Sequence, residues 1–133
     1  MNPFFLVVVL VDLTGVVVHG YVGHRLFLTP LTSERLFPTR LFGDAARSRV
    51  VFVVTWHAVT AAFATSAIMM SLMAVGAVTS RPAALFSSAM HAGFAVVALA
   101  ASGWRIFWPP QRRPLGFVIG MSTAALMGWL GTI

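Results

Sequence analysis

The chain has 133 residues, of which 59% are hydrophobic and only 9% are charged, so it has too little polar surface to cover a water-soluble globule. It has no cysteine, which excludes disulfides, thiolate metal sites and a cysteine nucleophile. The formal charge of +6 includes nine basic residues, all arginine, which lie between apolar segments and not along one helix face. This pattern indicates membrane topology and argues against a nucleic-acid partner.

Four apolar segments follow one another along the chain, and a helical crossing of the bilayer needs roughly 20 such residues. We expect membrane spans at about residues 3–23, 50–78, 83–103 and 115–133, with a long basic loop between the first two. Short connections after the second and third spans make sequential helices antiparallel neighbours. The sequence therefore predicts an all-α fold, with residues 1–133 forming a single four-transmembrane-helix antiparallel bundle.

The arginines predict the orientation of this bundle. The first loop carries five, the third loop three, the second loop one, and the termini none. Because cytoplasmic loops are enriched in positive charge, we expect loops one and three in the cytoplasm and both termini in the periplasm, in a bacterial inner membrane. The same arginines are expected to contact anionic membrane lipids.

Four ionisable residues lie inside the predicted spans, where such groups are costly and are candidates for function by default. They are Asp12 and His19 in the first span, His57 in the second and His91 in the third. On helical wheels each histidine falls on a stripe of small or polar residues, which in membranes marks the close approach of another helix. These faces should therefore point into the bundle.

His19 and His57 are predicted to lie at the same depth. His19 is six residues, about 9 Å, from Arg25, and His57 is eight residues, about 12 Å, from Arg49. Two level imidazoles on inward faces suit a b-type haem or an axial contact to a chlorophyll-type pigment, with glycine and alanine neighbours leaving room for the macrocycle. The alternative is that both histidines hydrogen-bond to backbone carbonyls, to Thr60 or to each other, without a cofactor.

Asp12 and His91 are also predicted to be level, nearer the middle of the bilayer. Asp12 is thirteen residues from Arg25 and His91 is fourteen from Arg105, about 20 Å and 21 Å. The two side chains could form a buried polar pair that serves structure alone, or a proton relay, or a contact that fixes a histidine tautomer, or each could pair with a partner protein.

The last span carries a ribbon of small residues at four-residue intervals: Gly116, Gly120, Ala124 and Gly128. Small residues at this spacing let helix backbones approach closely. The ribbon predicts a tightly packed helix partner, either inside the bundle or on another subunit.

Several local patterns occur together in this chain: Val18-His19-Gly20, Gly23-His24-Arg25-Leu26, Leu41-Phe42-Gly43 and Val54-Thr55-Trp56-His57. With them the chain resembles a group of small bacterial four-helix integral membrane proteins that have a histidine late in helix one and a Trp-His pair in helix two. The resemblance implies a four-helix fold with His19, His57 and His91 as the positions of interest. It transfers no activity, and His24 stands where that group is expected to carry an acidic residue.

With only three acidic residues, the chain cannot supply a set of nucleophile, general acid and general base, so we expect no enzyme activity. The sequence favours an accessory, non-catalytic, cofactor-free subunit of a larger inner-membrane complex of the respiratory or photosynthetic kind, bound to other integral membrane subunits. One alternative is an electron-transfer subunit that binds haem or a pigment through His19 and His57. A weaker alternative is a small transporter of metal ions or protons that uses Asp12 and His91.

Overall fold

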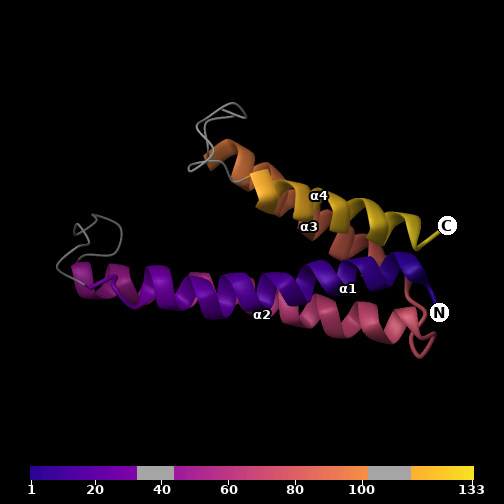
Figure 1. Cartoon of the computed structure of the whole chain (residues 1–133), viewed down its shortest axis with the longest axis horizontal. Coiled ribbons are helices and arrows are strands. Elements are labelled where there is room, and N and C mark those ends of the chain that lie inside the picture. Colours follow the sequence, from indigo (N-terminus) through magenta and orange to yellow (C-terminus); the bar gives the residue numbers. More distant parts are fainter. Residues whose placement is uncertain (33–43, 102–114) are drawn as a thin grey trace. The chain divides into compact units, whose positions relative to one another are not determined.

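The computed structural model of the chain describes residues 1–32, 44–101 and 115–133 (Figure 1). These residues are largely helical and include no strand. The helices are α1 (Pro3–Gly15), which continues as the π-helical segments η1 (Val16–Val22) and η2 (His24–Leu28), then α2 (Ala45–Ala74), α3 (Arg81–Ala101) and α4 (Leu115–Leu130). Residues 33–43 of the predicted basic loop and residues 102–114, which include the predicted third loop, lie outside the described residues.

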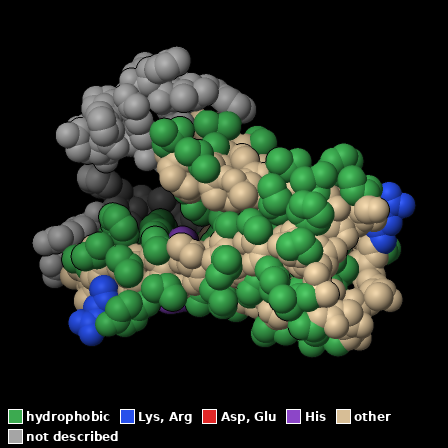
Figure 2. All heavy atoms as spheres, turned by 45° about the vertical axis from the view of Figure 1, so that its right-hand side comes forward, with side chains coloured by type: hydrophobic (Ala, Val, Ile, Leu, Met, Phe, Trp, Pro, Cys, Tyr) green, Lys and Arg blue, Asp and Glu red, His purple; other side chains and the backbone are tan. Residues whose placement is uncertain are grey.

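Three helical segments are long and apolar enough to cross a membrane: Pro3–Leu28, Ala45–Ala74 and Arg81–Ala100. The described part of the fourth, Leu115–Leu130, is apolar but shorter. Large hydrophobic side chains are exposed on every helix and are widely distributed over the face seen in Figure 2. A water-soluble protein rarely exposes so much contiguous apolar surface, so these segments indicate a membrane protein.

Each of the first three helices begins directly after a residue whose side-chain oxygen accepts a hydrogen bond from a backbone N–H of the first turn. This cap satisfies a group that the helix itself leaves unpaired. The pairs are Asn2 Oδ1 with the N–H of Phe4 at 3.0 Å, Asp44 Oδ1 with that of Arg47 at 2.7 Å, and Ser80 Oγ with that of Ala83 at 3.4 Å.

Asn2 also joins three helix ends. Its backbone N–H donates to the carbonyl of Ala74 at the end of α2, at 2.8 Å. Its side-chain amide Nδ2 donates to the carbonyl of Gly131, just after α4, at 3.0 Å. One side chain and one backbone amide therefore satisfy groups at the start of α1 and at the ends of α2 and α4.

Helix α2 ends at Ala74, several residues before the predicted end of the second span. Gly76 has a positive φ of 77°, a left-handed conformation that costs glycine little because it has no Cβ. Its N–H donates to the Met73 carbonyl and the N–H of Ala77 donates to the Leu72 carbonyl, at 3.1 Å and 2.9 Å. This pair of bonds is the Schellman motif, which terminates α2 and satisfies its last carbonyls.

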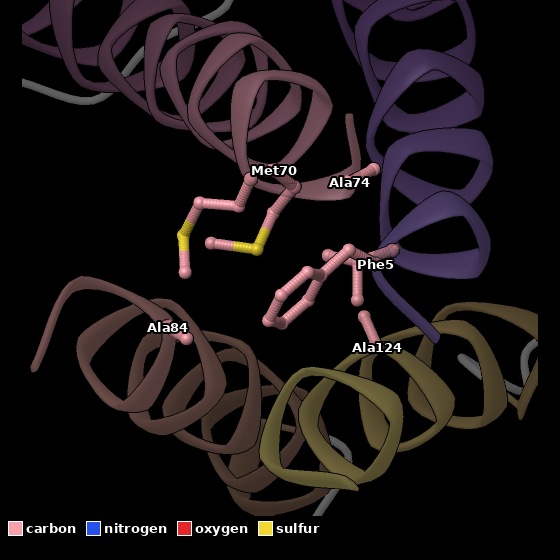
Figure 3. Close-up of a cluster of buried hydrophobic side chains, with 7 residues drawn as sticks. Phe5, Met70, Ala74, Ala84 and Ala124 are labelled. Carbon is pink, nitrogen blue, oxygen red and sulfur yellow. The ribbon is translucent and has the colours of Figure 1, made fainter. Parts of the chain in front are cut away.

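The chain forms two compact units, one comprising Met1–Asp12 and Ser66–Ile133, the other Leu13–Thr65. In the first unit all four helices contribute to one apolar core, in which Phe5 of α1, Met70 of α2, Ala84 of α3 and Ala124 of α4 face a common interior (Figure 3). Alanine at the last two positions allows α3 and α4 to pack directly against each other.

The ribbon of small residues on α4 is packed at one end only. A Cβ at Gly128 would lie 2.5 Å from Ser88 Oγ of α3, and Ala124 is fully buried. A Cβ at Gly120 would meet Val11 at an ordinary 3.8 Å, and no described atom lies within 4 Å of a Cβ at Gly116. The close approach predicted for the whole ribbon is therefore present at its C-terminal half.

Candidate functional site

The first polar cluster, in the first unit, is a pair of side chains from α1 and α3. His91 Nε2 lies 2.7 Å from Asp12 Oδ1, and both side chains are fully buried. Counting residues from the flanking arginines had predicted that these two groups lie at one depth, and the structure brings them into direct contact. No other buried carboxylate occurs among the described residues.

The hydrogen bonds of His91 determine how many protons the pair holds. Its Nδ1 lies 2.7 Å from the Ser87 carbonyl oxygen, which can only accept, so Nδ1 must carry a proton. Nε2 and Asp12 Oδ1 must then share one proton, because two lone pairs 2.7 Å apart would repel. The pair is either a neutral acid with a neutral imidazole or a carboxylate with an imidazolium. Both forms have no net charge, which limits the cost of burying them.

The pair continues into two hydroxyl groups. Ser87 Oγ lies 3.4 Å from His91 Nδ1 and 2.9 Å from Ser66 Oγ of α2, and both serines are buried. The chain from Asp12 to Ser66 thus connects α1, α3 and α2. At its other end, Asp12 Oδ2 is buried and has no hydrogen-bond partner among the described residues, which is rare for a carboxylate oxygen in a native structure.

The second polar cluster, in the second unit, contains the other histidines. His19 Nδ1 lies 3.0 Å from Thr60 Oγ1, and the His19 ring stacks on Trp56 with centroids 4.2 Å apart. The Trp56 indole N–H donates to the His19 carbonyl at 2.9 Å. His57 Nε2 lies 3.2 Å from His24 Nδ1. The sequence had paired His57 with His19 or with Thr60, whereas in the structure its hydrogen-bond partner is His24.

The π-helical segments explain this difference. In an α-helix His24 would be rotated by about 140° from His19, because each residue advances by about 100°. In a π-helix the backbone bonds join residues five apart, as between the Thr29 N–H and the His24 carbonyl at 2.9 Å, so the turn is wider and His24 lies closer to the face of His19. A helical wheel drawn for an α-helix could not place His24 on the face towards α2.

The same cluster does not suit a haem or pigment between His19 and His57. The glycines expected to make room for a macrocycle instead receive side chains of α2. A Cβ at Gly15 would lie 2.9 Å from the Phe63 ring. A Cβ at Gly20 would lie 2.7 Å from Thr60, and one at Gly23 would lie 2.6 Å from the Trp56 ring. The space that a macrocycle would need beside His19 is therefore occupied by side chains of α2.

Comparison with known proteins adds no homologue. No protein-family model matches the chain, and no similar curated protein or solved structure was found. The candidate sites therefore stand on the geometry of the described residues.

Proposed function

We propose that this chain is an accessory, non-catalytic subunit of a larger assembly in a bacterial inner membrane, with four spans arranged as an antiparallel bundle. Both termini face the periplasm and the two loops rich in arginine face the cytoplasm. The three long apolar segments and the exposed apolar side chains on every helix support a membrane location. In this function the Asp12–His91 pair holds α1 against α3.

The observation that carries the proposal is the half-packed ribbon on α4. Its C-terminal half is filled by α3, whereas no described atom approaches Gly116 and only an ordinary contact is made at Gly120. Small residues four apart support close helix pairing in a membrane, where no hydrophobic effect drives helices together. The open half is the surface that we assign to a helix of another subunit.

Purification from native membranes in a mild detergent tests this function. The chain should co-purify with at least one other integral membrane protein, and Gly116→Leu should release it while the isolated chain keeps its helix content. Ile119→Leu, on the exposed surface of the same helix, is the matched control and should leave the complex intact. A wild-type chain that purifies alone, or a complex insensitive to Gly116→Leu, would contradict the proposal.

Cysteines introduced at Ser33 and Thr132 test the orientation. An impermeant thiol reagent added to intact cells should label residue 132 and leave residue 33 unlabelled. Labelling of residue 33 without residue 132 would reverse the topology.

Proton transfer is a second candidate function, favoured by the buried pair that shares one proton. A proton that arrives at Asp12 Oδ2 would let the shared proton move from Oδ1 to His91 Nε2. The imidazolium would then release its Nδ1 proton to Ser87 Oγ as that hydroxyl passes its own proton to Ser66 Oγ, and Ser66 would in turn release its hydroxyl proton to water. The contact from Nδ1 to Ser87 Oγ, at 3.4 Å, is the longest in this path, so the ring must rotate for the proton to pass.

Liposomes that contain the purified protein and an internal pH dye test this second candidate. An imposed pH gradient with valinomycin should dissipate faster than in empty liposomes. Asp12→Asn should abolish the difference, and Ser71→Ala should retain it, since the Ser71 hydroxyl bonds only within its own helix in the structure. Equal rates with and without the wild-type protein would exclude this function and leave the structural one.

A further inference from the structure

His24 and His57 place two imidazole nitrogens side by side on different helical segments. His24 Nδ1 of η2 and His57 Nε2 of α2 are 3.2 Å apart, and both side chains are exposed in the structure. Two nitrogen ligands of one tetrahedral ion, each at 2.0–2.1 Å, stand about 3.3 Å apart. The separation of these nitrogens is that of a hydrogen bond between the rings, and it equally matches two ligands that share one metal ion. An exposed hydrogen bond between two imidazoles, by contrast, gains little over bonds to water.

Under the membrane placement proposed above, the histidine pair falls near one end of the second span. The other end of the span is taken at Ala74, whose carbonyl accepts the bond from Asn2. From Ala74, His57 is seventeen residues along α2, about 26 Å, and the hydrocarbon core is about 30 Å thick. An ion from the aqueous phase can reach a site at that depth.

Aromatic side chains gather at the same level. Trp56 contacts Phe27 and Phe52, with centroids 6.0 Å and 5.9 Å apart, and the Arg25 guanidinium lies 5.8 Å from the centre of the Tyr21 ring. Aromatic and arginine side chains concentrate at membrane–water interfaces, where one end of the side chain is apolar and the other is hydrated. This belt is a second indication that the pair lies at the boundary.

We propose that His24 and His57 bind one divalent first-row transition-metal ion of the imidazole-preferring class, Cu²⁺, Ni²⁺ or Zn²⁺, from the aqueous phase. Among the described residues no third His, Asp, Glu or Cys joins them, so water completes the coordination shell. Neutral imidazole suits these ions, while Mg²⁺ and Ca²⁺ require oxygen ligands. This site rests on the membrane placement proposed above and not on the subunit role.

Binding requires one change of tautomer and no redox step. In the metal-free pair the N–H of one ring donates a hydrogen bond to the facing nitrogen of the other ring, at 3.2 Å. The metal takes a lone pair from each facing nitrogen, so the donating ring must carry its proton on the far nitrogen instead. While both rings are neutral, no net proton is released.

Titration calorimetry on the untagged protein in detergent micelles tests the site with Zn²⁺ and Cu²⁺. We expect one ion per chain, tighter binding of Cu²⁺ than of Zn²⁺, and no binding of Mg²⁺. His24→Ala and His57→Ala should each weaken binding at least tenfold. His19→Gln, which removes the neighbouring imidazole outside the pair, is the matched control and should bind like the wild type.

A measurement on the wild-type protein alone keeps the proposal falsifiable if a variant fails to fold. The Cu²⁺ electron paramagnetic resonance spectrum should show coupling to two imidazole nitrogens at one ion per chain. Coupling to one or none would overturn the site. So would equal affinity in the wild type and in folded His24→Ala and His57→Ala variants, since the ion would then be bound adventitiously elsewhere.

Discussion

A double-mutant cycle on Asp12 and His91 measures what the buried pair contributes to stability. Removing one partner of a buried ion pair that stays charged costs about 3–5 kcal/mol. Here each truncation leaves the other side chain buried without its hydrogen-bond partner. Each of Asp12→Ala and His91→Ala should then cost about 1–3 kcal/mol, the penalty for leaving one buried polar group unsatisfied.

The double variant should cost less than the sum of the two single variants, because it leaves neither partner behind. Hydrogen bonds between membrane helices give coupling energies of about 0.6 kcal/mol on average and about 1.7 at most. A fully buried contact of 2.7 Å that shares one proton belongs at the upper end, so we expect a coupling of about 1–2 kcal/mol.

Unfolding in mixed micelles by increasing mole fractions of sodium dodecyl sulfate, followed by circular dichroism, provides the free energies. Ser71→Ala is the control, because its hydroxyl bonds to the Ala67 carbonyl one turn earlier in the same helix. It should change stability by less than about 0.5 kcal/mol. Additive single variants, with a coupling below about 0.5 kcal/mol, would refute the assignment of a shared proton between Asp12 and His91.

Substitutions at Asn2, Gly76 and the ribbon on α4 test the packing of the first unit, each by the same unfolding measurement. Asn2→Ala removes a helix cap and the bond to the Gly131 carbonyl, and should cost about 1–2 kcal/mol. Gly76→Ala forces a Cβ into a left-handed conformation and should cost about 1–2 kcal/mol, with no loss if the turn is not formed. Gly128→Leu should destabilise the isolated chain more than Gly120→Leu, and equal effects would place the close contact elsewhere.

The sequence was most informative where a regular α-helix could be assumed. Counting residues at a constant rise predicted that Asp12 and His91 lie at the same depth, and the two side chains are in contact in the structure. Helix spacing also identified the Gly128 end of the ribbon on α4, where a Cβ would not fit. Helix spacing could not predict that a Cβ at Gly116 has no described atom within 4 Å. Periodicity shows which residues share a helix face, and it does not show what packs against that face.

The sequence was least informative where the helix departs from α geometry. The first span was predicted to end at about residue 23, which left His24 in the loop, yet His24 lies in a continuous helix that reaches Leu28. The glycines gave a partial signal. Gly20 and Gly23 allow Thr60 and Trp56 of α2 to approach the backbone, which marks this face as the one towards α2. A widened helical turn has no simple sequence signature, so the partner of His57 could not be identified from spacing.

The position of the Asp12–His91 pair along its two helices accounts for its polar chemistry. Asp12 lies ten residues from Asn2, and His91 ten residues from Arg81, each about 15 Å along its helix. Under the proposed membrane placement this position is near the middle of a core about 30 Å thick, where an unpaired charge is costly. Two buried side chains that satisfy each other through a 2.7 Å contact are therefore the arrangement that this position favours.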